Sequence, residues 1–125
     1  MTKLNEIYKS KSDENMVEVM HSDNGTLTCD GYPMILLLEN KIDASIEKHK
    51  PVIEKFDNGI MVSVGAILHP MEKNHYIEFI EVIKGNRISK LFLKPGDKPQ
   101  GFFSFDFSLD IMVRAYCNIH GLWTN

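Results

Sequence analysis

Cysteine is scarce in this sequence, and its scarcity excludes a fold built on disulfides. The 125 residues include two cysteines, Cys29 and Cys117, too few for the bridges that hold small secreted domains together. Two isolated thiols are typical of a reducing compartment, where a free thiolate can act as a metal ligand. We therefore expect a cytoplasmic protein whose stability rests on a hydrophobic core.

The sequence also lacks long apolar runs and an excess of positive charge. Its longest apolar run, Met34 to Leu38, is far too short to cross a bilayer, and the polar start Met1 to Glu6 has no apolar stretch of the secretory kind. The formal net charge is −3 at pH 7, whereas nucleic-acid binders are usually basic. We expect neither a membrane nor a nucleic acid as a partner.

Helical periodicity is weak, whereas alternation of apolar and polar residues recurs along the chain. After residue 51, strand candidates follow one another at intervals of about ten residues with turn signals between them, as in a β-sandwich. An aromatic stripe of Phe103, Phe105 and Phe107 is predicted to face the core from one strand. We predict an all-β fold with strands over residues 52–56, 60–68, 76–83, 88–93 and 110–116. The aromatic stripe lies on a further strand, before the last of these.

Near the start of the chain, the triplet Asp23-Asn24-Gly25 separates two short strand candidates, residues 16–20 and 26–28. Such a triplet favours a tight turn between paired strands. We therefore predict a small N-terminal hairpin, which by itself could bury little apolar surface.

The densest chemistry lies near the end of the chain, where Cys117 and His120 are three residues apart. This spacing can chelate one ion because the backbone between the two residues turns tightly and its N–H groups can point at the sulfur. The spacing alone is a weak signal, since a buried cysteine beside a surface histidine would look the same. Three further histidines, His49, His69 and His75, lie at the ends of predicted strands or in loops, where sites are usually carried.

Four imidazoles and one thiolate are one ligand too many for a closed tetrahedral zinc site and one short of an octahedron. Such a set fits a redox metal with one open position, which would be the reactive one. Imidazole suits iron, copper, nickel and zinc alike, so counting ligands does not select the metal.

These residues resemble the superoxide reductases of the desulfoferrodoxin and neelaredoxin family. The resemblance covers the whole chain and is carried by Glu47-Lys48-His49-x-Pro51, Val64-Gly65, His69-Pro70-Met71, His75-Tyr76-Ile77 and Cys117-Asn118-x-His120-Gly121-x-Trp123. It implies an immunoglobulin-like β-sandwich over residues 39–125.

The resemblance also implies a site in that sandwich. One non-haem iron ion per chain would be bound by four equatorial histidines and an axial cysteine, namely His49, His69, His75, His120 and Cys117. Glu47 would be the sixth ligand in the oxidised state, and Lys48 would be the cation beside the open position.

Residues 1–38 resemble the small desulforedoxin-like domain of the same family. The matching residues are Ile7-Tyr8-Lys9, Val17-Glu18-Val19, Gly25-Thr26-Leu27, Cys29 and Gly31-x-Pro33-Met34. Where that domain supplies four cysteines to a second iron, this chain has Ser10, Asp13, Cys29 and Asp30. One thiol cannot form a tetrathiolate site, so we expect a degenerate segment without metal, Cys29 as a relic without a ligand role, and His21 as a surface residue.

The activity implied by the resemblance is the one-electron reduction of superoxide to hydrogen peroxide, with a rubredoxin-like or other small protein as electron donor. A homodimer or homotetramer is implied as well. Because the net charge is negative, we expect local cations to steer the anion, chiefly Lys48 with Lys50 and Lys73. The alternatives are a superoxide dismutase, which needs no outside reductant, a non-catalytic metal-binding module, and a plain immunoglobulin-like interaction domain.

Overall fold

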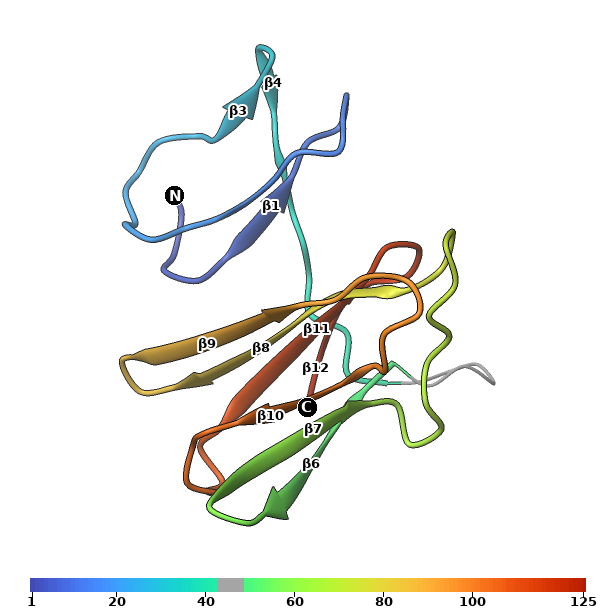
Figure 1. Cartoon of the computed structure of the whole chain (residues 1–125). Helices are drawn as coiled ribbons and strands as arrows, with labels where there is room; N and C mark the ends of the chain where they lie inside the picture. The colour runs from blue at the N-terminus through green and yellow to red at the C-terminus, as the bar shows by residue number, and fades with distance from the viewer. Residues whose placement is uncertain (43–48) are drawn as a thin grey trace. The chain divides into compact units, whose positions relative to one another are not determined.

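The computed structural model describes residues 1–42 and 49–125. Over these residues the secondary structure consists of strands, turns and loops, without a helix, in agreement with the predicted all-β class. The chain forms two compact units, Met1–Leu38 and Glu39–Asn125 (Figure 1). No described segment forms the long apolar helix that a membrane span would need.

Five short strands make up the first unit. Strand β1 (Ile7–Lys9) lies between β2 (Met16–Glu18) and β5 (Ile35–Leu36), and all three are antiparallel. A separate two-residue pairing joins β3 (Thr28–Cys29) to β4 (Tyr32–Pro33). Ile7 and Val19 are the buried apolar residues of this unit, so its hydrophobic core is small.

The predicted N-terminal hairpin is wrong. Met16–Glu18 pairs with Ile7–Lys9, whereas Thr28 pairs with Pro33. The reason lies at Asp23, whose backbone N–H donates to Thr2 Oγ1 at 3.0 Å and whose carbonyl accepts the Thr2 N–H at 2.8 Å. The expected turn is therefore tied to the start of the chain and does not close a hairpin.

The second unit is a sandwich of two antiparallel sheets, drawn as two layers in Figure 1. One sheet has the strand order β10-β7-β6 and the other the order β12-β11-β8-β9. The strands of the first sheet are β6 (Pro51–Phe56), β7 (Gly59–Val64) and β10 (Gln100–Phe103). Those of the second are β8 (Ile77–Lys84), β9 (Arg87–Phe92), β11 (Met112–Cys117) and β12 (Gly121–Thr124).

Alternation along the strands builds the core of this unit, because successive side chains of a strand point to opposite faces. The apolar side chains that pack together come mainly from β7, β8 and β11: Ile60, Val62, Val64, Ile77, Ile80, Val82, Val113, Ala115 and Cys117. Phe103 and Phe105 of the predicted stripe join this core, but Phe107 is 48% exposed. Strand β10 ends at Phe103, and the inward alternation continues only as far as Phe105.

Two strand boundaries matter for the site. The predicted strand over residues 60–68 ends at Val64, because Gly65 has a φ of +87° and turns the chain. After this turn the backbone N–H of His69 donates to the carbonyl of Val64 at 3.0 Å, which holds the loop against the strand end. Strand β12, which sequence reasoning missed, pairs with β11 across a tight turn that begins at Cys117.

A buried ion pair lies between the two central strands of the larger sheet. Glu81 of β8 and Arg114 of β11 are direct partners in the register, and both side chains are buried. Arg114 donates to Glu81 Oε1 through Nε at 2.8 Å and also through Nη2. Its Nη1 lies 3.2 Å from Glu39, and Lys90 Nζ lies 3.1 Å from Glu81 Oε2.

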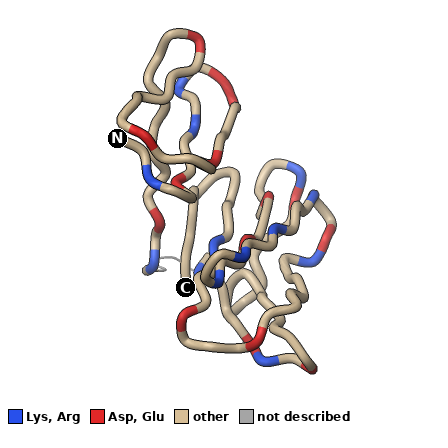
Figure 2. The backbone as a smooth tube through the Cα atoms, turned by 90° about the vertical axis from the view of Figure 1, so that its left-hand side faces the viewer, with Lys and Arg blue, Asp and Glu red and all other residues tan. Residues whose placement is uncertain are grey.

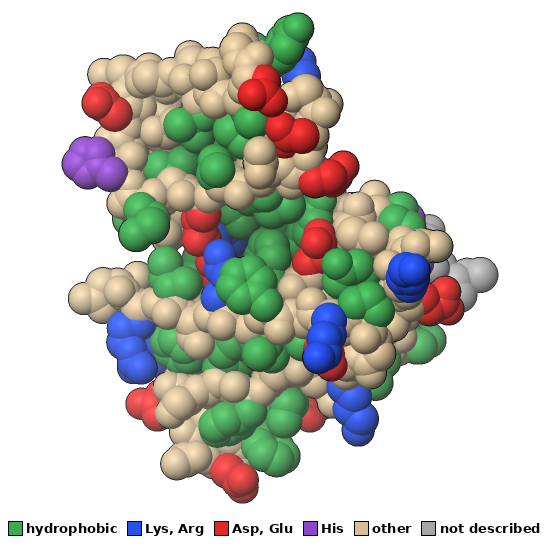
Figure 3. Space-filling model, turned by 45° about the horizontal axis from the view of Figure 1, so that its top comes forward, with side chains coloured by type: hydrophobic (Ala, Val, Ile, Leu, Met, Phe, Trp, Pro, Cys, Tyr) green, Lys and Arg blue, Asp and Glu red, His purple; other side chains and the backbone are tan. Residues whose placement is uncertain are grey.

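Most other charged residues lie along exposed parts of the chain, with both signs interspersed (Figure 2). On the face of the second unit shown in Figure 3, hydrophobic side chains share the surface with charged ones. Exposed apolar residues of this unit include Ile88, Phe92 and Met112.

Replacing Arg114 by Leu should lower the free energy of unfolding by about 3–5 kcal/mol, because the buried Glu81 carboxylate loses its main partner. The double variant Glu81→Leu/Arg114→Leu should recover most of this loss, since neither buried charge then remains. Urea unfolding of the three proteins measures the difference. Equal losses in the single and double variants would contradict this account of the pair.

Candidate metal centre

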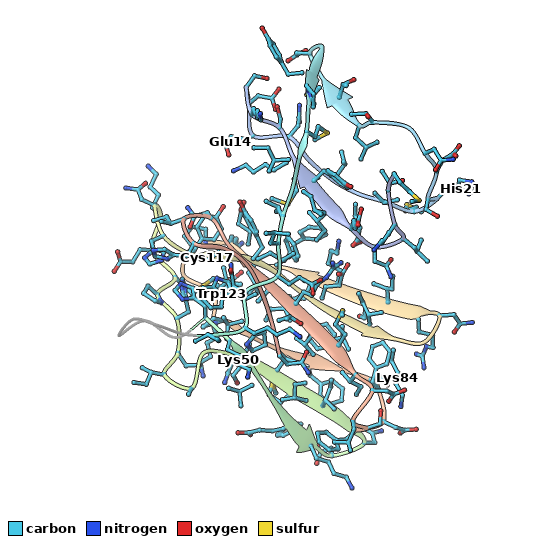
Figure 4. The ribbon with its side chains drawn as sticks, turned by 180° about the vertical axis from the view of Figure 1, so that it is seen from behind. Glu14, His21, Lys50, Lys84, Cys117 and Trp123 are labelled. Carbon is cyan, nitrogen blue, oxygen red and sulfur yellow. The ribbon has the colours of Figure 1, made fainter. Side chains whose placement is uncertain are left out.

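The structure brings together five side chains that are far apart in the sequence. One nitrogen from each of four histidines and the Cys117 sulfur all lie within 4.8 Å of one another. His49 lies two residues before the start of β6, Cys117 ends β11, and the remaining members lie in turns or connections: His69, His75 and His120. In Figure 4, Cys117 and Trp123 lie at one end of the sandwich, and Lys84 lies at the other.

The four imidazoles form a closed cycle of neighbours. The ring centroids of His49 and His69 are 4.7 Å apart, and those of His69 and His75 are 4.7 Å apart. His75 and His120 are separated by 5.1 Å, and His120 and His49 by 4.8 Å, which completes the cycle. Adjacent rings are tilted by 60–84°, so no two neighbours in this cycle stack face to face.

The spacing of the donor atoms fits a common ion. His49 Nε2 and His120 Nδ1 are 3.0 Å apart. Two nitrogens that each lie about 2.1 Å from one metal ion, at a right angle, are separated by about 3.0 Å. The Cys117 sulfur lies 3.8 Å from the same His120 nitrogen. Four imidazoles in a cycle with a thiol beside them form a donor set that suits an imidazole- and thiolate-binding transition metal.

Burial is uneven across the cluster. His49, His69 and Cys117 are buried, His75 is half-buried, and His120 is exposed. The cluster therefore has a buried side, formed by His49, His69 and Cys117, and an exposed side at His120.

Backbone groups next to the cluster orient two of its members. His69 Nδ1 lies 2.7 Å from the carbonyl oxygen of Pro70, and since that oxygen can only accept, Nδ1 is the protonated nitrogen. A neutral His69 therefore carries its lone pair on Nε2. The backbone N–H of His120 donates to the Cys117 sulfur at 3.4 Å, as the Cys-x-x-His spacing predicts. The turn is completed by Gly121, whose φ of +87° favours glycine.

Trp123 contacts two members of the cluster, although no role in the site was predicted for it from the sequence. Its ring stacks on His49, with centroids 4.6 Å apart and planes inclined by 15°. Its indole N–H donates to the His120 carbonyl at 3.2 Å. The sequence did contain one signal, an aromatic residue three positions after the candidate ligand His120. This signal does not reveal the stacking partner His49, which is distant in the sequence.

Glu47 and Lys48 fall outside the described residues. Lys50 and Lys73 are both exposed, on segments that carry His49 and His75 respectively. His21 is exposed and belongs to the first unit, in keeping with its prediction as a surface residue.

A second, smaller group lies in the first unit, at the positions where four cysteines were expected of a metal-binding relative. Ligand atoms of Asp13, Cys29 and Asp30 lie within 4.8 Å of one another. The Asn15 N–H donates to Asp13 Oδ1 at 2.7 Å and is the main reason that the pKa of this carboxyl is lowered from its usual value. The Cys29 thiol donates to Asp13 Oδ2 at 3.4 Å and acts in the same direction. With one sulfur, this group cannot form a tetrathiolate site.

Comparison with known proteins places these features in a family. The sequence model of the family described as desulfoferrodoxin matches residues 41–125. The desulfoferrodoxin of Syntrophotalea carbinolica is 48% identical over 120 residues, which cover 96% of this chain and 94% of that protein.

Solved structures of superoxide reductases have a fold similar to that of this chain. The superoxide reductase of Treponema pallidum superposes with a TM-score of 0.76 at 22% identity, over 96% of each chain. A superoxide reductase of Giardia intestinalis, described as 1Fe-SOR, has a TM-score of 0.53 and 30% identity over 63% of this chain and 95% of that one. The family match spans more than half of the chain, and the relative from Syntrophotalea carbinolica covers nearly all of it. The chain therefore belongs to the desulfoferrodoxin family.

Proposed function

We propose that this protein is a superoxide reductase with a single iron site formed by His49, His69, His75, His120 and Cys117. The observation that carries the proposal is the closed cycle of four imidazoles with a buried thiol beside it. A structural zinc site would use four donors, whereas this set has five and an exposed side. Membership of the desulfoferrodoxin family, and solved relatives named superoxide reductases, support the substrate.

The reaction adds one electron and two protons to superoxide, which leaves as hydrogen peroxide. Iron, when bound, supplies the one-electron redox chemistry, and a thiolate ligand increases the electron density on it. The electron comes from outside the chain, and we propose a small rubredoxin-like protein as its source. The chain's own residues hold the donors, keep water from the buried side, and leave the exposed side accessible to the anion.

Positive charge near the exposed side has to attract the substrate, because the protein carries a net charge of −3. Lys50 and Lys73 are exposed on segments adjacent to two of the histidines. We propose that Lys48 is the principal cation and delivers protons, and that Glu47 acts in the oxidised state as a sixth ligand. Both roles rest on the family resemblance of Glu47-Lys48-His49, since neither residue is among those described.

We further propose that only the second unit binds iron and carries out the reaction. Residues 39–125 would form the iron-binding reductase domain, and residues 1–38 a degenerate desulforedoxin-like domain without metal. The short strands and the single thiol of the first unit support this division. Assembly as a homodimer or homotetramer and a cytoplasmic location remain predictions.

Elemental analysis of the purified protein should give one iron per chain, because the second unit offers five suitable donors and the first offers one thiol. Cys117→Ser should remove the visible thiolate-to-metal absorption, whereas the matched variant Cys29→Ser should keep it. Two irons per chain, or loss of the absorption in Cys29→Ser, would place a thiolate site in the first unit instead.

The reductase and dismutase functions differ in their electron balance. A reductase should consume one equivalent of supplied reductant for each superoxide removed, because every electron comes from the donor. A dismutase would remove superoxide without net consumption. Stopped-flow mixing with a known superoxide dose, with the reduced donor followed by absorbance, measures the ratio. A ratio near zero at full superoxide removal would exclude the reductase.

Lys48 and its neighbour Glu47 should affect different steps. Lys48→Ala should slow the reaction of the reduced enzyme with superoxide by about tenfold or more and flatten its salt dependence, since steering by exposed charge is screened over about 10 Å at 0.1 M salt. Glu47→Ala should leave this rate nearly unchanged and alter the oxidised spectrum. Pulse radiolysis across a salt series tests both. Equal slowing in the two variants would refute the division of roles.

A further inference from the structure

Asn118 lies between two members of the metal-binding cluster, Cys117 and His120, in the turn that joins β11 to β12. It belongs to the motif that carries Cys117 and His120, but Asn118 itself has been given no role above. The residue is half-buried, and its side chain is directed to the connection that carries His75.

The hydrogen bonds of Asn118 surround His75. Its side-chain oxygen accepts the backbone N–H of Tyr76 at 2.9 Å, and its side-chain nitrogen donates to the carbonyl of Asn74 at 3.0 Å. Its own backbone N–H donates to the Tyr76 carbonyl at 3.2 Å. One residue thus binds the backbone immediately before and immediately after His75.

We call these hydrogen bonds of Asn118 around His75 a clamp, and it lies where the regular sheet ends. The pairing of β11 with β8 shifts register between Tyr116 and Cys117, and its last pair is Cys117 with Ile77. Beyond this pair the side-chain amide of Asn118 takes the place of a backbone peptide group and continues the ladder. His75 itself lies in a tight turn closed by two backbone bonds with Glu72, of 2.9 and 3.1 Å.

We propose that Asn118 is a positioning residue that fixes His75 relative to Cys117 and His120 and thereby sets how tightly the cluster holds its metal. The inference rests on the proposed function in taking iron as the metal. The geometric basis of the inference is that Asn118 links three of the five donor residues: it follows Cys117 in the turn that leads to His120, and its side chain binds the backbone on both sides of His75. Residues that orient ligands in this way typically change metal affinity by about 10–100-fold when they are lost.

The same sheet contains a matched control. Asn125 makes the same three bonds at the other end of β11: its side-chain oxygen accepts the Val113 N–H at 2.8 Å, and its side-chain nitrogen donates to the Ile111 carbonyl at 3.1 Å. Its backbone N–H donates to the Val113 carbonyl at 3.2 Å. This clamp surrounds Met112, which is not a member of the cluster.

The test compares the metal-loaded full-length chains of Asn118→Ala and Asn125→Ala with the parent protein. Transfer of the metal to an excess of a coloured chelator should be about tenfold or more faster in Asn118→Ala, and its thiolate-to-metal absorption should shift. Asn125→Ala should match the parent protein in both measurements even if it unfolds at a lower temperature. Should Asn118→Ala fail to fold, Asn118→Asp, which keeps the acceptor for Tyr76 and loses the donor to Asn74, takes its place.

Unchanged metal release and absorption in the Asn118 variant, with only a lower melting temperature, would overturn the proposal and leave Asn118 a purely structural clamp. An equal effect in Asn125→Ala would overturn it too. The assay uses no superoxide and is run with Fe(II) and with Co(II). A protein that holds metal but does not reduce superoxide would therefore refute the proposed function without affecting this inference.

Discussion

The antiparallel pairing of β8 with β11 is the interaction on which the rest of the second unit depends. On one face of this pair, Val113 and Ala115 enter the core between the sheets. On the opposite face, Glu81 and Arg114 form the buried ion pair. Cys117 lies at the end of this pair of strands. The alternation of side chains that buries apolar surface therefore also fixes the position of the sulfur.

Much of this sandwich could be predicted from local sequence, because alternation and turn residues are local signals. The predicted strands over 52–56, 76–83 and 88–93 agree closely with β6, β8 and β9. One error, the N-terminal hairpin, arose where a distant contact decides the outcome. The bond between Thr2 and Asp23 removed the expected hairpin, and the pairing of Glu81 with Arg114 has no local signature.

The candidate site could be predicted only in part for the same reason. The Cys-x-x-His spacing anticipates the backbone N–H of His120 on the Cys117 sulfur, since both belong to one turn. That His49, His69 and His75 join them follows from the order of strands in space, which spacing does not encode; family resemblance supplied it. Side chains that support the donors from another segment, such as Trp123 on His49, were missed.

In the first unit, side-chain hydrogen bonds connect segments that are distant in the sequence. A unit of this size has little core and usually needs a metal or disulfide as a cross-link. Here Ser10 Oγ accepts the N–H groups of Ser12 and Asp13, and Asp13 accepts the thiol of Cys29. The Ser10 bonds hold the loop after β1 in shape, and the bond between Asp13 and Cys29 joins this loop to the end of β3, as a metal ion shared by the two segments would. Carboxylate, hydroxyl and thiol groups thus connect these segments by hydrogen bonds, whereas the single thiol does not provide the four sulfurs of a tetrathiolate site.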